Sequence, residues 1–231
     1  MASNQVALIL GAGPRVGTAV AKSLSSKGYA VAVTSRRGTG SKDANGFVSL
    51  KADFSDPNSI PTLFRDVETH LGSPPSVVVY NAAGMTPPPD KDSVLSIPAD
   101  RFAADLTINT ISSYVAAQEC IKAWERLPKE TKKTFIYTGN VLNTVVLPVP
   151  MMVTLGVGKS ASAYWIGVAD ATYSARGHRF FYADERHADG KMKGMDLDGP
   201  AHGEFYAQLA DHPADVPWHA TFLKGKGYVK A

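Results

Sequence analysis

Three glycines near the N-terminus have the types and spacing needed to hold a phosphate group. The apolar run Val6–Leu10 leads directly into Gly11, Gly13 and Gly17, and a helical pattern follows. A strand that turns sharply into a helix brings backbone N–H groups close to a pyrophosphate, which then lies at the helix N-terminus. We expect Gly11 and Gly13 to permit the turn and the close approach, and Gly17 to let the helix pack on the strand. The segment predicts a dinucleotide site; the alternative is a surface turn without a ligand.

Two arginines follow the second expected strand. An NAD site has an acidic residue there, about 20 residues after the glycines, for the ribose 2′-hydroxyl. This chain has Ser35, Arg36 and Arg37 and no carboxylate. A guanidinium suits a phosphate because its donors are forked and it stays charged, and Arg15 in the glycine loop could join the other two. The pattern predicts NADP(H) as cofactor; the alternative is a solvated pair of arginines.

Strands and helices must alternate to position these residues. Seven apolar runs predict strands within residues 5–10, 29–34, 46–52, 76–80, 133–138, 178–183 and 220–223. Helical patterns lie between them, at about 16–28, 56–67, 98–126, 157–176 and 202–210. This alternation predicts an α/β fold of Rossmann type, doubly wound, with a mostly parallel seven-stranded sheet and helices on both faces. We expect residues 1–231 to form a single dinucleotide-binding domain with a short C-terminal tail on the substrate side.

The composition excludes several other classes of protein. Of the 231 residues, 24 are basic and 21 acidic, and the net charge of +3 is too weak to predict nucleic-acid or membrane binding. Cys120 is the only cysteine, so no internal disulfide can form and a reducing compartment, the cytoplasm, is expected. No apolar run approaches the ~18 residues of a membrane span, and the start of the chain lacks the basic stretch of a signal peptide. The histidines have no metal-type spacing, so no metal site is expected.

Further segments resemble the short-chain dehydrogenase/reductase family over about residues 5–185. Asp53 and Phe54 follow the third expected strand, where the family has an aspartate that contacts the adenine. The run Asn81-Ala82-Ala83-Gly84 is similar to the family's Asn-Asn-Ala-Gly, which lies along the cofactor. In the long helix, Asn109 matches the family's asparagine that holds a water near the catalytic lysine. Lys159 matches that lysine, which also hydrogen-bonds the nicotinamide ribose.

The residues that transfer a proton in this family are missing. Its signature is Tyr-x-x-x-Lys, and Leu155 stands in the tyrosine position; the serine after the fifth strand is replaced by Asn140 or Gly139. In the family the tyrosine donates a proton to the developing alkoxide, the lysine lowers the tyrosine's pKa, and the serine helps to hold the oxyanion. A leucine side chain can donate neither a proton nor a hydrogen bond. We expect the amide of Asn140 to hold the oxyanion in place of the serine, and Lys159 to keep its hydrogen bond to the nicotinamide ribose.

Other polar residues are candidates for the missing acid. The family's Pro-Gly after the sixth strand is absent, and Asp184 and Glu185 occupy that region. Ligands of α/β sheets bind at the edge where these strands end. We therefore expect Tyr182, Asp184, Glu185 and Leu155 to line a substrate pocket, the alternative for the two acids being a solvated charged loop.

The resemblance implies an atypical NADP(H)-dependent oxidoreductase that acts on a small organic carbonyl, imine or enone. Two alternatives remain open: a non-redox enzyme (a cyclase, isomerase or lyase) on the same scaffold, and a non-catalytic NADP(H)-binding protein. The catalytic candidates are Lys159, Asn109 and Asn140. The expected cofactor contacts are Gly11, Gly13, Arg15, Val16, Gly17, Ser35, Arg36, Arg37, Asp53, Phe54, Asn81, Ala82, Ala83, Gly84 and Lys159. The resemblance also implies a homodimer or homotetramer, paired through the helices around 98–126 and 157–176.

Overall fold

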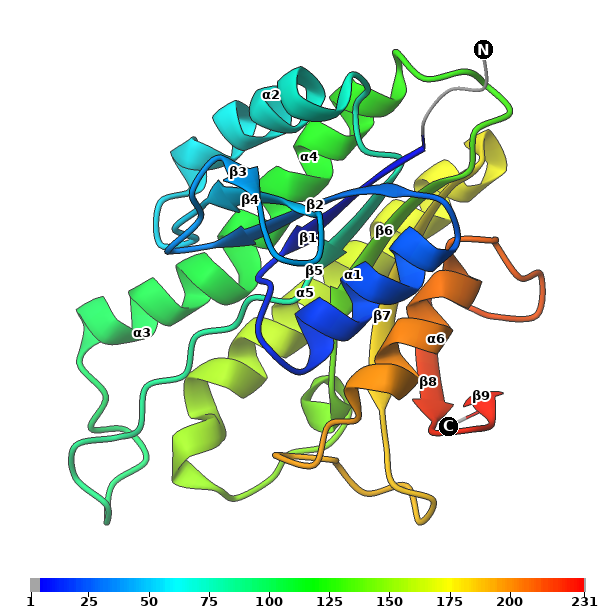
Figure 1. Ribbon diagram of the computed structural model, residues 1–231. Helices are drawn as coiled ribbons and strands as arrows, with labels where there is room; N and C mark the ends of the chain where they lie inside the picture. The colour runs from blue at the N-terminus through cyan, green and yellow to red at the C-terminus, as the bar shows by residue number, and fades with distance from the viewer. Residues whose placement is uncertain (1–4, 231) are drawn as a thin grey trace.

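The structure is a computed structural model and describes residues 5–230 (Figure 1). One sheet of nine strands runs through this part of the chain. The strands are β1 Val6–Leu10, β2 Ala30–Ser35, β3 Ser41–Lys42, β4 Val48–Lys51, β5 Val77–Tyr80, β6 Lys133–Thr138, β7 His178–Glu185, β8 His219–Leu223 and β9 Gly227–Tyr228. Their order across the sheet is β3-β4-β2-β1-β5-β6-β7-β8-β9. The order reverses between β1 and β5, which is the point where doubly wound sheets bind their ligands.

The seven predicted strands are the parallel ones, and the doubly wound α/β fold is confirmed. The predicted total of seven was too low by two, because β3 and β9 add an antiparallel strand at each edge. Each of these strands has only two residues, so neither has an alternating pattern that a sequence reading could detect.

Helices cover both faces of the sheet. They are α1 Val16–Ser26, α2 Ile60–Leu71, α3 Ala99–Leu106, α4 Ser112–Trp124, α5 Val153–Tyr173 and α6 Gly199–Leu209. Figure 1 shows α1 and α6 side by side on one face, with α2, α4 and α5 on the other. Alternate side chains of each strand enter one of two cores: on β6, Ile136 faces α1 and α6, whereas Phe135 and Tyr137 face α4 and α5. Because both faces of the sheet are covered, the central strands β1 and β5 consist of buried, mainly aliphatic residues.

The C-terminal tail is part of the sheet. Strand β8 pairs in parallel with β7, and β9 turns back on β8. Helix α6 begins at Gly199, earlier than the predicted start near His202, because the side chain of Asp198 caps it by accepting from the N–H of Ala201 at 2.9 Å. Within the described residues, no helix has both the length and the apolar character to cross a membrane.

Candidate cofactor and active site

Two adjoining cavities lie at the carboxyl edge of the parallel strands. The larger cavity, of about 630 Å³, follows the ends of β1, β2, β4 and β5. The smaller cavity, of about 230 Å³, follows the ends of β6 and β7 and the start of α5. Both are lined by Asn81 and Ala83. Ten of the predicted cofactor contacts line the larger cavity: Gly11, Gly13, Ser35, Arg36, Arg37, Phe54, Asn81, Ala82, Ala83 and Gly84.

The glycine loop has the conformation that its sequence predicts. Gly11 has φ +97°, and a Cβ there would lie 2.7 Å from the nitrogen of Ala82 on the neighbouring connection. A Cβ on Gly17 would lie 2.6 Å from the Cα of Ala12, so only glycine allows α1 to start this close to the turn. A Cβ on Gly13 would meet no atom within 4 Å, which leaves its backbone open to a ligand. The side chain of Val16 is buried among core residues, so only its backbone can serve as a contact.

The three predicted phosphate-binding arginines are not grouped together. Arg36 and Arg37 line the larger cavity, whereas Arg15 is absent from its lining. The guanidinium of Arg15 instead donates a hydrogen bond to the carbonyl of Met195, on the segment between β7 and α6. This contact ties the glycine loop to the chain that passes over the smaller cavity.

Asp53 also lies outside the cavity lining. Its exposed carboxylate accepts hydrogen bonds from the backbone N–H of Ser55 at 3.0 Å and from the Ser55 hydroxyl at 2.8 Å. These bonds, with a smaller contribution from the charge of Arg36, lower the pKa of Asp53. The neighbouring Phe54 is buried and packs edge-on against Tyr80, which fixes the floor of the larger cavity.

Four of the predicted catalytic and substrate residues meet in the smaller cavity: Asn140, Leu155, Lys159 and Glu185. Lys159 is buried, and its Nζ donates to the carbonyl of Thr138 at 2.7 Å and lies 4.4 Å from the ring centre of Tyr137. Burial lowers the pKa of Lys159 to about 7, and the negative charge of Asp184 only partly opposes this effect. The site therefore holds a lysine that can exchange its proton near neutral pH.

Asn109 is buried outside both cavity linings, in a π-helical turn, Thr107–Ile111, that separates α3 from α4. Its side chain clamps the backbone of Gly84, accepting from the N–H at 2.9 Å and donating to the carbonyl at 2.8 Å. Its own carbonyl accepts from the hydroxyls of Tyr137 at 2.8 Å and Ser162 at 2.9 Å. The described contacts make Asn109 a positioning residue, since its side-chain oxygen and its carbonyl both have protein partners.

Tyr182 was predicted from the sequence to line the substrate cavity, but it is absent from the lining. Tyr80, Tyr137 and Tyr182 are aligned on β5, β6 and β7, and their rings stack with centres 5.8 and 5.7 Å apart. The Tyr182 hydroxyl donates to the carbonyl of Asn140 at 2.8 Å and accepts from its N–H at 3.1 Å. A Cβ on Gly139 would lie 2.2 Å from the Tyr182 ring. Strand alternation thus directs Tyr182 into the core on the α4 and α5 side, where it excludes a serine at position 139.

Asn140, the other candidate for the serine position, does line the smaller cavity. Its Oδ1 accepts from the N–H of Leu142 at 3.1 Å and caps a short helical turn. Among the described residues its side-chain NH₂ has no hydrogen-bond partner, so this group is free to hold a substrate oxygen.

Asp184 and Glu185 lie on opposite sides of β7. Asp184 is buried away from the cavity lining, contrary to the prediction, and its Oδ2 accepts from Nε of Arg186 at 2.7 Å. Burial raises the pKa of Asp184 despite this partner. Glu185 does line the smaller cavity, and its Oε2 accepts from the N–H of Asp198 at 2.9 Å. The sequence reading missed one wall, which is formed by Met192, Lys193, Gly194, Met195 and Leu197.

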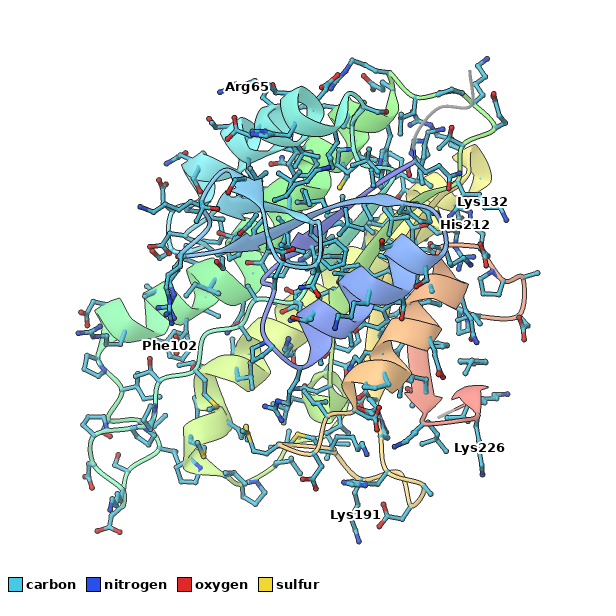
Figure 2. The ribbon with its side chains drawn as sticks, viewed as in Figure 1. Arg65, Phe102, Lys132, Lys191, His212 and Lys226 are labelled. Atoms are coloured by element: carbon cyan, nitrogen blue, oxygen red, sulfur yellow. The ribbon has the colours of Figure 1, made fainter. Side chains whose placement is uncertain are left out.

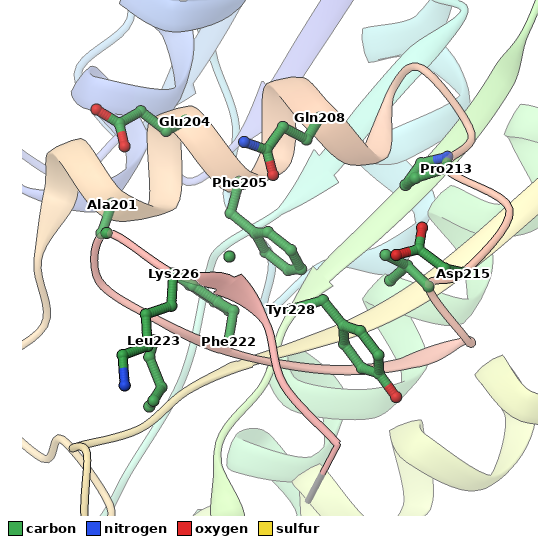
Figure 3. Close-up of a pocket in the computed structure, with 13 residues that line it drawn as sticks. Ala201, Glu204, Phe205, Gln208, Pro213, Asp215, Phe222, Leu223, Lys226 and Tyr228 are labelled. Carbon is green, nitrogen blue, oxygen red and sulfur yellow. The ribbon is translucent and has the colours of Figure 1, made fainter.

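A third cavity lies outside this site. It has a volume of about 370 Å³ and lies between α6 and the hairpin of β8 and β9 (Figure 3). Phe205 and Phe222 stack at its base with ring centres 4.4 Å apart, and Glu204, Gln208 and Lys226 lie around it. It contains none of the predicted site residues. Among residues 5–230, no three His, Cys, Asp or Glu side chains are grouped so as to hold a metal ion.

A doubly wound parallel sheet with a glycine turn at its switch point defines a dinucleotide-binding protein of Rossmann type. A family model described as enoyl-(acyl carrier protein) reductase matches residues 11–155. The short-chain dehydrogenase/reductase dmxR12 of Cryptosporiopsis sp. (strain 8999) is 40% identical to this protein, over 98% of this chain and 95% of its own length. The chain belongs to the short-chain dehydrogenase/reductase family, whose members are oxidoreductases that generally bind NAD(P)(H).

Solved structures of the same family share the fold. A metagenomic short-chain oxidoreductase in complex with NADP has a TM-score of 0.75 at 16% identity, with 96% of this chain and 97% of that chain covered. A short-chain dehydrogenase/reductase from Serratia marcescens has a TM-score of 0.71 at 20% identity, with the same shares covered. At these identities the likeness concerns the fold alone.

Proposed function

We propose that this chain is an atypical NADP(H)-dependent oxidoreductase that acts on a small organic carbonyl, imine or enone. The observation that carries the cofactor preference is the lining of the larger cavity. Arg36 and Arg37 follow β2 there, and no carboxylate is found among the described residues that line the cavity. An unpaired acidic residue would favour the 2′-hydroxyl of NAD, whereas two guanidinium groups favour a 2′-phosphate.

The described residues fit a dinucleotide along the whole edge. In this proposal the open backbone at Gly13 and the N-terminus of α1 hold the pyrophosphate, and Arg36 and Arg37 hold the 2′-phosphate. Asn81 donates to the carbonyl of Gly11 at 2.8 Å, which holds the loop beside the place of the nicotinamide half. When bound, the cofactor supplies or accepts a hydride. We treat the chain as one cofactor-binding domain whose C-terminal part adds a wall to the substrate cavity.

The residues of the smaller cavity suit a substrate that needs little help from an acid. Leu155 can donate no proton, whereas the NH₂ group of Asn140 can hold an oxyanion. Lys159 offers N–H donors close to where the ribose would lie. An imine needs an acid least, since its nitrogen can arrive already protonated, whereas a ketone or enone develops the oxyanion that Asn140 can hold.

The missing tyrosine and serine also favour a second candidate, a non-catalytic NADP(H)-binding protein. Both candidates require the same cofactor site and differ only in turnover. A third possibility, a non-redox enzyme on the same scaffold, would need no cofactor for its chemistry.

Calorimetry and turnover together separate these candidates. We expect the wild type to bind NADPH at least ten times more tightly than NADH. The double variant Arg36→Ala, Arg37→Ala should weaken NADPH binding by about 1.5–3 kcal/mol for each charged hydrogen bond that is lost. Its binding of NADH should stay nearly unchanged. NADPH consumption is then followed with panels of ketones, enones and imines. Binding with turnover supports the oxidoreductase, binding without turnover supports the second candidate, and no binding contradicts both.

We also propose that the chain forms a homodimer through α4 and α5. A groove of about 340 Å³ between these helices is lined by Tyr114, Ile121, Trp165 and Val168 among others. Tyr164 also lines this groove and is 78% exposed, which is unusual for a large aromatic ring on a monomer surface.

A further inference from the structure

One wall of the smaller cavity contains a pair of opposite charges, of which the carboxylate is fully buried and the ammonium partly exposed. The side chain of Glu185 is fully buried and that of Lys193 is 13% exposed, and Nζ of Lys193 lies 3.5 Å from Oε1 of Glu185. Oε2 is held by the N–H of Asp198 at 2.9 Å and lies 3.4 Å from Nδ1 of His202. Within the described residues Oε1 of Glu185 is buried without a hydrogen-bond partner, and the charged group that faces it is Nζ of Lys193. Groups buried in this state are costly unless a ligand completes them.

Only three ionisable side chains line this cavity among the described residues: Lys159, Glu185 and Lys193. The Nζ of Lys159 already donates to the carbonyl of Thr138. Glu185 acts as an acceptor here, since its Oε2 receives the N–H of Asp198 at 2.9 Å and its Oε1 faces Nζ of Lys193 at 3.5 Å. Of the two lysines, Lys193 is the one whose Nζ makes no hydrogen bond among the described residues, and its charged neighbour is Oε1 of Glu185 at 3.5 Å.

The backbone holds Lys193 in place on both sides. Before it, Arg186 and Met192 form an antiparallel bridge, and the N–H of His187 donates to the carbonyl of Lys191 at 3.0 Å. After it, the carbonyl of Met195 accepts from the guanidinium of Arg15. A donor fixed in this way needs little reorganisation when a substrate binds.

We propose that Lys193 donates the proton to the substrate oxygen, in place of the missing tyrosine, and that Glu185 positions Lys193. This inference rests on the proposed reduction by NADPH. A hydride forms the new C–H bond at the carbonyl carbon, the C=O π bond breaks, and its electron pair moves to the oxygen. The oxygen takes a proton from the Lys193 ammonium. NADPH becomes NADP⁺, and the neutral lysine regains its proton from solvent at the partly exposed cavity mouth.

The rest of the lining indicates the class of ketone. Met85, Met152, Leu155, Met195 and Leu197 form apolar walls around the polar end. Methionine adapts its shape to flat or irregular apolar groups. The cavity therefore suits an uncharged ketone with an apolar, ring-containing body and the reacting carbonyl at its inner end.

The test compares Lys193→Met, Lys193→Arg and Lys191→Met. Lys191 is a matched control on the same segment: its side chain is 80% exposed, it pairs with Asp189 at 2.8 Å, and it points away from the molecule (Figure 2). The activity probes are uncharged aromatic ketones of one to three fused rings, of which the best wild-type substrate is used. We expect Lys193→Met to lower kcat/KM by about 10²- to 10⁴-fold, Lys193→Arg to retain part of the activity, and Lys191→Met to change nothing. NADPH affinity by calorimetry is expected to stay the same in all three.

A pH profile and an anion probe give readouts that a purely structural role would not move. We expect wild-type kcat/KM to fall at high pH, and Lys193→Met to remove this fall because methionine carries no exchangeable proton. The charged groups that influence Lys193 are Glu185 on β7, Asp198 and His202 at the start of α6, and Lys159 on α5 in the same cavity. The NADP⁺ complex is also titrated with 2-naphthoate, a flat anion, and Lys193→Met should weaken its binding at least tenfold.

Wild-type turnover together with an unchanged rate and pH profile in Lys193→Met would overturn this inference alone. The inference would also be overturned if Lys159→Met, and not Lys193→Met, removed the fall of kcat/KM at high pH. A wild-type protein that turns over imines or enones but no ketone would overturn this inference alone, whereas one that turns over none of the three would overturn the proposed function as well.

Discussion

Lys159 lines the smaller cavity although Leu155 stands four residues before it, in the position of a tyrosine. Its ammonium makes one hydrogen bond, to the carbonyl of Thr138, and lies over the face of the Tyr137 ring. Asp184 contributes only charge at a distance, and its carboxylate is bound by Arg186. A lysine buried with so few partners is more stable as the neutral amine than it is in water.

The pH dependence of stability should reveal this lysine. Its pKa is about 7 in the folded chain and 10.5 when exposed, so between these values the unfolded chain binds a proton that the folded chain does not. Stability therefore rises with pH over this window, by up to about 1.4 kcal/mol per pH unit from this one group. Urea unfolding at pH 7, 8 and 9 should show a steeper rise for the wild type than for Lys159→Met. Parallel slopes in the two proteins would contradict a depressed pKa.

At the scale of the elements, the three stacked tyrosines shape the end of β6. Each hydroxyl donates to a backbone carbonyl beyond the strands: Tyr80 to Ile108 at 2.6 Å, Tyr137 to Asn109 at 2.8 Å and Tyr182 to Asn140 at 2.8 Å. The rings link three strands to the π-helical turn and to the start of the loop after β6. This arrangement leaves room only for glycine at position 139.

Replacing this glycine should therefore be costly. A Cβ at position 139 would lie 2.2 Å from Cε1 of Tyr182, so Gly139→Ala forces the ring from its stack and is expected to cost about 1–3 kcal/mol of stability. Adding Tyr182→Leu should reduce the cost of Gly139→Ala, because the two sites are in contact and their effects are not additive. Gly156→Ala is the matched control, since its Cβ would meet nothing nearer than 3.9 Å. Equal urea midpoints for both alanine variants would show that the stack yields without strain.

The elements differ in how far the sequence predicts them. The parallel strands are predictable because each is a buried apolar run, and the glycine turn because its backbone geometry excludes other residues. The burial of Tyr182 follows from strand alternation only when Tyr137 and Tyr80 are known to be its neighbours across the sheet. The π-helical turn leaves the helical pattern intact and is therefore invisible in sequence. The wall that contains Lys193 belongs to an irregular segment without periodicity, so only the fold brings it to the cavity.

At the scale of the whole molecule, the two faces of the sheet are covered unequally. On one face α1 and α6 pack against each other, and the pocket beside α6 is largely polar at its rim. On the other face α4 and α5 leave an apolar groove open, with Tyr164, Val168 and Tyr114 exposed along it. The second face is the one that a partner surface of the same kind would bury favourably.

In a two-fold symmetric dimer the groove of one chain packs against the same groove of the other chain. One charged substitution per chain therefore places two charges in the interface. Tyr164→Glu or Val168→Glu should therefore convert a homodimer into monomers without unfolding them, because both side chains are more than half exposed in the single chain, at 78% and 52%. Val146→Glu is the matched control, since Val146 is 94% exposed on the loop after β6 and away from the groove. Sedimentation velocity should give the mass of two chains for the wild type and for Val146→Glu, and of one chain for the groove variants. A monomeric wild type, or groove variants that remain dimeric, would show that this face is not the interface.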